Sequence, residues 1–253
     1  MTPTPQAPVL VVTGGGRGIG AATALLGARR GYRVCVNYLR DETSAARVAE
    51  EITRGGGEAI VVQADVGHSD EVTRLFATVD SRLGTVTALV NNAGALETQC
   101  RLEDLDEERL LRILRTNVVG TFLPSREAVR RMSTRHGGGG GAIVNVSSAA
   151  SRLGSPGEYL DYAASKGAID TFTYGLALEV AAEGIRVSAV RPGIIDTDIH
   201  ASGGEPGRAS RLAGSLPMKR PGRAEEVAEA ILWLLSDAAS YTTGTIVDVA
   251  GGR

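Results

Sequence analysis

The stretch that decides the fold is "PVLVVTGGGRGIGAATALLGARR", residues 8–30 of a 253-residue chain. An apolar, β-branched run leads into a glycine-rich turn, Thr13 to Gly20, and a helix-like segment follows at once. Glycines in such a turn let the backbone approach a phosphate, and the N-terminus of the next helix offers it free N–H groups. The spacing of Gly14, Gly18 and Gly20 is G-x-x-x-G-x-G and not the strict G-x-G-x-x-G, but the context is the one that the motif requires. We therefore expect a βαβ unit that binds the pyrophosphate of a dinucleotide.

The pattern of this stretch is repeated along the chain. Short apolar runs at 8–13, 33–38, 58–65, 87–94, 141–148, 185–193 and 244–252 alternate with helix-like segments at 18–30, 44–54, 70–83, 106–135, 162–183 and 223–235. Nearly continuous hydrophobic runs are typical of strands buried on both faces, and their alternation with helices indicates βαβ units. No composition break divides the chain. We predict one α/β domain over residues 1–253, a doubly wound parallel sheet of about seven strands with helices on both faces.

Composition excludes several classes of protein. The net charge of -2 argues against a general nucleic-acid binder. No apolar run approaches the roughly 18 residues of a membrane span. Cys35 and Cys100 are too few and too distant for a disulfide framework, so we expect a cytoplasmic protein. Residues 1–7 lack a signal-peptide pattern and are expected to be a disordered lead-in. We expect no metal, because the histidines have no ligand spacing and are taken as surface or loop residues: His68, His136 and His200.

The end of the second expected strand bears on the choice between NAD and NADP. Dinucleotide folds that choose NAD place a carboxylate there to accept hydrogen bonds from the ribose 2′-OH. Asn37 and Tyr38 stand at this point, and the acidic residues 41–42 come late enough to begin the next helix instead. Arg17 and Arg40 can both reach a 2′-phosphate, which the paired donors of a guanidinium suit. We favour NADP(H), and solvated charge is the alternative role of the two arginines.

A tyrosine and a lysine four residues apart are the second informative feature. The 27 basic residues comprise 25 arginines and only two lysines, Lys166 and Lys219. A position that keeps lysine in such a chain needs an amine, whose pKa the protein can shift, and not merely a charge. Tyr162 precedes Lys166 by one helical turn, so the phenol and the ammonium share one face. About 0.05 such pairs are expected by chance, and the alternative is an ordinary surface lysine.

The pair suits the chemistry of a reductase. Hydride transfer to a ketone needs a proton donor, and a phenol with a pKa of about 10 is a slow acid at pH 7. We expect the Lys166 ammonium to lower the pKa of Tyr162. Ser148 can hold the substrate oxygen, and Asn117 can anchor a water that relays protons to Lys166. The candidate catalytic set is therefore Asn117, Ser148, Tyr162 and Lys166.

With these motifs in place, the chain resembles a classical short-chain dehydrogenase/reductase, and within that family the 3-oxoacyl-acyl-carrier-protein reductases. The resemblance spans the whole length through "TGGGRGIG", "ADV" (64–66), "NNAG" (91–94), "TNVVG" (116–120), "NVSS" (145–148), "YAASK" (162–166), "RPG" (191–193) and "DVAGG" (248–252). It implies a Rossmann fold and a nicotinamide cofactor. Together with the residues above, it implies cofactor contacts at Gly14, Arg17, Gly18, Ile19, Gly20, Asn37, Tyr38, Arg40, Asp65, Val66, Asn91, Ala93, Gly94, Tyr162, Lys166, Pro192, Gly193, Ile195 and Thr197.

One departure from the family pattern concerns the substrate side. Ser148 and Tyr162 are 14 positions apart, one more than the usual family interval, with the extra residue in "GSPGEYLDY" (154–162). This leaves Ser147 as an alternative to Ser148. The loop-like stretch at 193–222 is expected to be a lid over the site. Substrate identity would depend on that stretch and on a set of mostly small or apolar side chains: Leu96, Ala149, Ala150, Ser151 and Tyr159.

The leading hypothesis is an NADP(H)-dependent oxidoreductase acting on a small carbonyl or secondary alcohol. An NAD-dependent alcohol, sugar or polyol dehydrogenase is the alternative. A non-catalytic cofactor sensor would have no use for the full proton-handling set, and a Ser-His-Asp hydrolase would need a G-x-S-x-G motif. The resemblance also implies a homotetramer or dimer. An acyl carrier protein would need a basic surface to bind. Four arginines could form that surface, namely Arg126, Arg130, Arg131 and Arg135. We favour the alternative that they lie on a solvated helix face.

Overall fold

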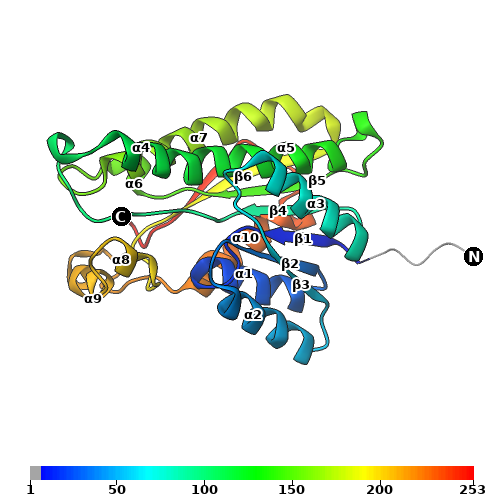
Figure 1. Ribbon diagram of the computed structural model, residues 1–253, viewed down its shortest axis with the longest axis horizontal. Coiled ribbons are helices and arrows are strands. Elements are labelled where there is room, and N and C mark those ends of the chain that lie inside the picture. Colours follow the sequence, from blue (N-terminus) through cyan, green and yellow to red (C-terminus); the bar gives the residue numbers. More distant parts are fainter. Residues whose placement is uncertain (1–6) are drawn as a thin grey trace, which may run out of the picture.

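The computed structural model describes residues 7–253, and at its centre is a seven-stranded sheet in the order β3-β2-β1-β4-β5-β6-β7 (Figure 1). The pairings are all parallel. The strands are β1 (Val9–Val12), β2 (Arg33–Tyr38), β3 (Ala59–Gln63), β4 (Ala88–Asn91), β5 (Gly141–Val146), β6 (Ile185–Pro192) and β7 (Ile246–Val249). The expected disorder of the lead-in lies outside the described residues except at Ala7, whose carbonyl accepts two hydrogen bonds from Arg33.

Helices cover both faces of the sheet. On one face lie α1 (Gly18–Arg29), α2 (Glu42–Arg54) and α10 (Ala224–Leu235), and on the other α3 (Ser69–Arg82), α4 (Glu107–Leu114), α5 (Gly120–Met132) and α7 (Leu160–Val180) (Figure 1). The side chains of β1 alternate between two hydrophobic cores, one on each face of the sheet. Val9 and Val11 belong to the core on the α3 side, and Leu10 and Val12 belong to the core on the α1 side. Because both faces are buried, the strand is continuously apolar in sequence.

The order of strands places the site. β1 pairs with β2 on one side and with β4 on the other, so the chain direction across the sheet reverses between β1 and β4. Ligands of open α/β sheets bind at such a switch point, outside the carboxyl ends of the strands. The glycine-rich turn follows β1, and the "NNAG" segment begins within β4, so both meet at this edge.

The expected long helix at 106–135 is interrupted. Residues Arg115–Val119 form a π-helical turn between α4 and α5, and a short 3₁₀ turn, Thr134–His136, follows α5. Two features of the chain are consistent with this break in the helix. Pro124 has no N–H to donate to the carbonyl of Gly120. A side chain at Gly120 would lie 2.6 Å from Val66 Cγ2, so the widened turn packs closely against the segment after β3.

The segment at 193–222, defined here as the lid, is not a structureless loop. It contains two short helices, α8 (Ile199–Ser202) and α9 (Arg208–Leu212). A parallel bridge between Ile195 and Gly222 closes its base. Opposite the lid, the short helix α6 (Ala150–Leu153) follows β5. The chain end lies between α6 and the two lid helices (Figure 1).

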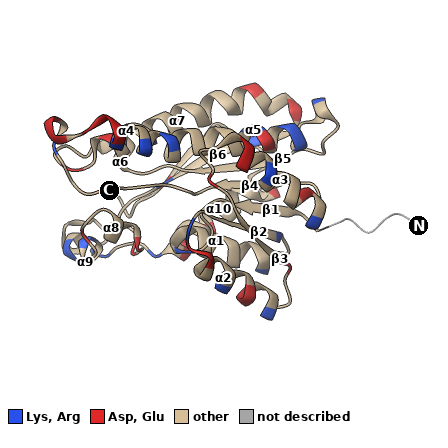
Figure 2. Ribbon diagram, viewed as in Figure 1, with Lys and Arg blue, Asp and Glu red and all other residues tan. Residues whose placement is uncertain are grey.

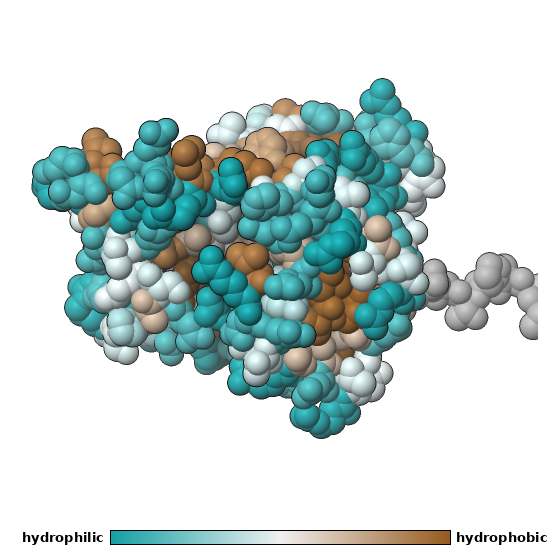
Figure 3. Space-filling model, in the orientation of Figure 1, coloured by the Kyte–Doolittle hydropathy of each residue, from teal (hydrophilic) through white to brown (hydrophobic). Residues whose placement is uncertain are grey.

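Two surface features bear on partners. The α5 arginines that could receive an acidic partner are already paired: Glu127, with a side chain only 4% exposed, contacts Arg126, Arg130 and Arg131. Acidic and basic segments accordingly lie side by side along α5 (Figure 2). Hydrophobic side chains gather on the edge formed by α4, α5 and α7 (Figure 3). The exposed ones are Leu111, Val119, Phe122, Tyr174 and Leu178. Within residues 7–253, no helix has the length and apolar character that crossing a membrane requires.

Candidate active site

A cleft of about 790 Å³ lies at the carboxyl edge of the sheet. It brings together segments that are distant in sequence: the glycine-rich turn, the ends of β2 to β6, the start of α7 and the lid. Most of the expected cofactor and catalytic residues line it, namely Gly14, Arg17, Gly18, Ile19, Asn37, Tyr38, Arg40, Asp65, Val66, Ala93, Gly94, Ser148, Tyr162, Lys166, Pro192, Gly193, Ile195 and Thr197. Three expected residues are not in the lining: Gly20, Asn91 and Asn117.

The glycine-rich turn has the shape of a phosphate cradle. Gly14 and Gly18 adopt φ values of +61° and +54°, which disfavour any residue with a Cβ. A Cβ on Gly20 would lie 2.4 Å from the Gly14 carbonyl oxygen, so this glycine serves the tight packing of the turn. No side chain caps the N-terminus of α1, whose free N–H groups and positive dipole end can receive an anion. The turn therefore fits a pyrophosphate.

Two neighbouring asparagines in "NNAG" have different surroundings, and the Asn91 side chain does not line the cleft. The Asn91 side chain is buried in the core and donates to Ser125 Oγ and Asn145 Oδ1, both at 2.8 Å. Asn92 lines the cleft instead, and its amide donates to the carbonyls of Thr13 and Gly14 at 3.0 Å. Asn91 is the last residue of β4, whereas Asn92 lies just beyond the strand, where its N–H turns back to the Val90 carbonyl. Asn92, which the sequence analysis missed, ties β4 to the glycine-rich turn.

At the end of β2, an asparagine stands where a ribose-binding carboxylate is usual in NAD-binding folds. Asn37 is buried, accepts a hydrogen bond from the Gly14 N–H at 3.3 Å and donates to the Ala64 carbonyl at 3.0 Å. It holds the turn in place and does not project into the cleft as a free group. Asp41 caps α2 by accepting from the Ser44 N–H. Hydrogen bonds with the side chain and then the backbone of Ser44 lower the pKa of Asp41.

Arg17 and Arg40 remain as the charged groups at this end of the cleft. Both are exposed, and neither side chain makes a hydrogen bond or an ion pair with any residue in the described part of the chain. This distinguishes them from most other arginines of the protein, which have carboxylate or carbonyl partners. An unpartnered guanidinium on a cleft wall is free to bind an anion there.

The segment after β3 carries a second residue that the sequence analysis missed. Asp65 accepts a hydrogen bond from the Gly67 N–H at 2.8 Å, and its other oxygen lies 3.1 Å from His68 Nδ1. His68 also lies 3.5 Å from the Arg115 guanidinium, and both side chains line the cleft. His68 is therefore part of the cleft wall and not an unrelated surface group. The sequence signal that could have identified His68 as a cleft residue is its position, three residues after Asp65 and at the start of α3.

The candidate catalytic side chains converge at the other end of the cleft. Tyr162 and Lys166 lie on the first turns of α7, and the Lys166 ammonium stands 5.5 Å from the centre of the phenol ring. Lys166 Nζ donates to the Val146 carbonyl at 2.7 Å, which anchors the amine to the end of β5. Ser148 faces the phenol, while Ser147 is buried and donates to the Lys166 carbonyl. Of the two serines, Ser148 is therefore the one placed to meet a substrate.

The pKa of Tyr162 does not move in the expected direction. Burial raises the pKa of the phenol, and a hydrogen bond with Ser148 only partly opposes that effect. The Lys166 ammonium lies over the phenol ring and donates to the Val146 carbonyl. Burial instead lowers the pKa of Lys166 to about 8, with Asp170 opposing the change. Tyr162 is thus a protonated group at neutral pH, ready to donate.

Asn117 makes several hydrogen bonds beside the catalytic residues. Its side chain is fully buried within the π-helical turn, accepts from the Ala95 N–H at 2.7 Å and donates to the Ala95 carbonyl and to Ser165 Oγ. Its carbonyl accepts from Thr121 Oγ1 at 2.8 Å. With these groups engaged, the Asn117 side chain fastens the segment after β4 to α7 next to Lys166. It positions the site and does not face the cleft.

The substrate end of the cleft is enclosed by apolar groups. The lining here includes Leu96, Ala149, Ala150, Leu153, Tyr159 and Ile199. Ser151, which we expected in this wall, is turned away, and its hydroxyl donates to the Ser148 carbonyl. The base of the lid reaches the cofactor end as well, because a Cβ on Gly18 would lie 3.3 Å from Thr197 Cγ2.

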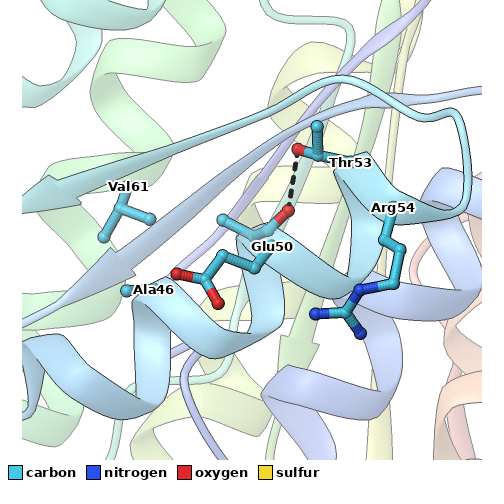
Figure 4. A pocket seen from close by; sticks show the side chains of 6 residues that line it. Ala46, Glu50, Thr53, Arg54 and Val61 are labelled. Carbon is cyan, nitrogen blue, oxygen red and sulfur yellow. Dashed lines mark hydrogen bonds between the residues drawn. The ribbon is translucent and has the colours of Figure 1, made fainter.

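A second hollow lies far from these groups, between the outer face of α2 and β3. It is lined by Ala46, Ala49, Glu50, Thr53, Arg54 and Val61 (Figure 4). The Thr53 hydroxyl donates to the Ala49 carbonyl, and Glu50 and Arg54 extend from the same helix without converging on a common point. It holds no group with evident chemistry. No cluster of metal-ligating side chains occurs within residues 7–253.

Comparison with known proteins agrees with this geometry. A family model described as enoyl-(acyl carrier protein) reductase matches residues 14–253. The chain is 60% identical over 245 residues to the uncharacterized oxidoreductase YgfF of Escherichia coli (strain K12), covering 97% of this chain and 99% of that protein. It is 39% identical over 251 residues to a 3-oxoacyl-[acyl-carrier-protein] reductase of Synechocystis sp., covering 97% and 96% of the two chains.

A solved structure shows the same fold at similar coverage. The 3-ketoacyl-(acyl-carrier-protein) reductase from Brucella melitensis, complexed with NADH, superposes with a TM-score of 0.90 at 32% identity and 99% coverage of both chains. The fold and the cleft define a Rossmann-type oxidoreductase that uses a nicotinamide cofactor. The chain belongs to the short-chain dehydrogenase/reductase family.

Proposed function

We propose that the protein is an NADP(H)-dependent reductase of small ketones, working in reverse as a secondary-alcohol dehydrogenase. The observation that carries this proposal is the convergence of Ser148, Tyr162 and Lys166 at the apolar end of a cleft whose other end fits a dinucleotide. A phenol, a hydroxyl and an ammonium together supply what carbonyl reduction demands of a protein. The bound nicotinamide would supply or accept the hydride at this end of the cleft.

Each residue has a defined task in this mechanism. Ser148 donates a hydrogen bond to the carbonyl oxygen and holds it against the phenol of Tyr162. Tyr162, kept protonated by burial, transfers its proton to that oxygen as negative charge develops there. The Lys166 ammonium then stabilises the resulting phenolate from beside the ring. The apolar wall excludes water, which strengthens these interactions.

Preference for NADP rests on the adenosine end. The side chains of Arg17 and Arg40 flank the cleft there without hydrogen-bond or ion-pair partners among the described residues. Asn37 is engaged with Gly14, and Asp41 caps α2 through its Oδ1. A 2′-phosphate would pair with both guanidinium groups. An NAD-dependent alcohol or polyol dehydrogenase is the alternative, and the relative strength of NADPH and NADH binding decides between them.

We propose compact 3-oxo compounds as the substrate class, because the wall of Leu96, Ala149 and Tyr159 is apolar and close to Ser148. The acyl-carrier-protein reductases among the relatives support the 3-oxoacyl chemistry. Delivery by a carrier protein has less support here, since Glu127 pairs with Arg126, Arg130 and Arg131, and Arg135 faces Glu183.

We also propose a cytoplasmic homotetramer. One contact would cover the exposed apolar side chains of α4, α5 and α7, and another would use the edge strand β7 with the exposed Trp233 and Tyr241 beside it. Such exposed apolar groups favour association. Sedimentation equilibrium would test it: a monomer at micromolar concentration would exclude it.

The test of the catalytic proposal is Tyr162→Phe, which removes the proton donor and keeps the ring. We expect kcat for reduction of ethyl 3-oxobutanoate with NADPH to fall by about 10²- to 10⁴-fold. Calorimetry should show NADPH affinity within a few-fold of wild type. Ser148→Ala should also lose turnover, whereas Ser151→Ala, whose hydroxyl points away from the cleft, is the matched control. A Tyr162→Phe variant that keeps its turnover would refute the assignment.

A further inference from the structure

Only two of the 25 arginines are buried, Arg109 and Arg208. Their side chains are 8% and 7% exposed. They come from opposite sides of the site, Arg109 from α4 and Arg208 from the lid helix α9. Both hold the same four-residue segment, 158–161, which immediately precedes Tyr162. Burying a guanidinium is costly unless its donors are satisfied, so this arrangement calls for a specific explanation.

Arg109 holds the N-terminal end of α7 in place. Its Nε donates to Asp161 Oδ2 at 2.8 Å, and its Nη1 donates to the Thr98 carbonyl at 2.6 Å. Asp161 in turn accepts from the Tyr162 N–H at 2.9 Å. One guanidinium therefore connects α4, the segment after β4 and the backbone of the proton donor itself.

Arg208 fastens the lid to the same segment. Its guanidinium donates to both oxygens of Glu158, at 2.5 and 3.1 Å, and to Glu205 at 2.9 Å. It also stands 5.2 Å from the centre of the Tyr159 ring, whose hydroxyl donates to the Gly203 carbonyl. A Cβ on Gly203 would lie 2.8 Å from Leu96 Cδ2 and 3.0 Å from the Tyr159 hydroxyl, so lid and wall pack closely here.

The extra residue between Ser148 and Tyr162 belongs to this arrangement. Gly154, Ser155 and Gly157 adopt φ values of +73°, +49° and +71°, and these left-handed positions fold the longer segment into a compact loop. The loop presents Glu158 and Tyr159 to the lid, and the Glu158 carbonyl accepts from the Cys100 N–H at 3.0 Å. The loop at 154–159 thus offers a docking place for Arg208.

We propose that Arg109 and Arg208 clamp residues 158–161 between α4 and the lid, and that this clamp sets substrate selectivity. Arg208 is the specificity-determining residue: it holds the lid against Tyr159 and limits the pocket to compact substrates. Arg109 is a positioning residue that acts on Tyr162 through Asp161. The selectivity part of this inference rests on the proposed carbonyl reductase function, whereas the holding of the lid does not.

The first test measures the lid without turnover. Hydrogen–deuterium exchange of the backbone amides at 199–216 is compared in wild type, Arg208→Gln and Arg211→Gln. Arg211 is the matched control, because it lies on the same helix and pairs with the same Glu205 but makes no hydrogen bond or ion pair with residues 158–161. We expect Arg208→Gln to accelerate exchange by about tenfold and Arg211→Gln to leave it within twofold. Equal exchange in the two variants would overturn the clamp.

The second test measures selectivity with ethyl 3-oxobutanoate and ethyl 3-oxodecanoate. Arg208→Gln should raise kcat/KM for the longer ester relative to the shorter by about tenfold, and Arg211→Gln should leave the ratio unchanged. An unchanged ratio in Arg208→Gln, in an enzyme active on both esters, would overturn the specificity role. Wild-type protein that reduces neither ester would overturn the proposed function, while the exchange experiment still decides whether the clamp exists.

Arg109 needs variants that keep the fold, since removing one member of a buried pair leaves an isolated charge. Arg109→Gln/Asp161→Asn replaces both charges with neutral hydrogen-bonding groups. We expect kcat to fall by about 10²-fold with KM for NADPH unchanged, because misplacing Tyr162 affects only the chemical step. Arg109→Lys, which keeps the charge, should recover part of this loss. A kcat within twofold of wild type in the double variant would refute the positioning role.

Discussion

Lys166 offers the sharpest prediction, because burial and one carboxylate control its charge. Its side chain is almost fully buried, and this environment lowers its pKa from 10.5 to about 8. The difference corresponds to about 3 kcal/mol that disfavours the charged form. The lysine is then about 90% protonated at pH 7 and about 10% protonated at pH 9. Because the ammonium stabilises the Tyr162 phenolate, kcat/KM for reduction should be constant up to about pH 7 and fall about tenfold per pH unit well above pH 8.

The composition of the chain makes this pKa directly measurable. Only two lysines are present, so Lys219→Arg leaves Lys166 as the single lysine. NMR of that variant, labelled with ¹³C at the lysine ε carbon, should show one signal that titrates with a midpoint near pH 8. A midpoint at or above 10 would refute the claim that burial governs this amine.

The carboxylate partner gives an independent check. Asp170, one helical turn beyond Lys166, raises the pKa of that lysine. Asp170→Asn should therefore move both the NMR midpoint and the fall in kcat/KM to lower pH. Asp248→Asn is the matched control, because Asp248 also pairs with Arg191 but does not act on Lys166. A shift to higher pH in Asp170→Asn would contradict the electrostatic argument.

Further predictions concern the cofactor end. Arg40→Ala should weaken NADPH binding by about tenfold, measured by calorimetry, and leave NADH binding within twofold, because only the 2′-phosphate contact is lost. Arg47→Ala is the control, because Arg47 is another arginine without a hydrogen-bond or ion-pair partner but lies outside the cleft, and it should leave the affinity for both nucleotides unchanged. If Arg40→Ala weakened the binding of NADPH and NADH equally, the phosphate contact would be excluded. Gly20→Ala would place a Cβ 2.4 Å from the Gly14 carbonyl oxygen and should lower the free energy of unfolding in urea by about 1–3 kcal/mol. Gly139→Ala points into open space and serves as its control, so equal stability of the two variants would show that the glycine-rich turn tolerates a side chain.

Local patterns in the sequence were sufficient for the architecture. Continuous apolar runs predicted strands buried on both faces, and their alternation with helices predicted a parallel sheet, which the structure and the family relationship confirm. Asp41 was correctly expected to begin a helix, because capping depends on residues only three positions apart. Such features depend on residues that are close together in the sequence, so they can be predicted without knowing which distant segments contact one another.

What the sequence could not settle depends on side-chain direction and burial. Asn91 and Asn92 are adjacent and identical in type, yet one joins a buried network and the other lines the cleft. The phenol of Tyr162 becomes a weaker acid, although its lysine neighbour suggested the opposite, because burial raises its pKa more than the hydrogen bond with Ser148 lowers it. No sequence pattern distinguishes the two buried arginines from the rest of the 25 arginines. Only the tertiary structure brings Arg109 and Arg208 to one loop from positions far apart in the chain, because burial and pairing depend on how distant segments pack.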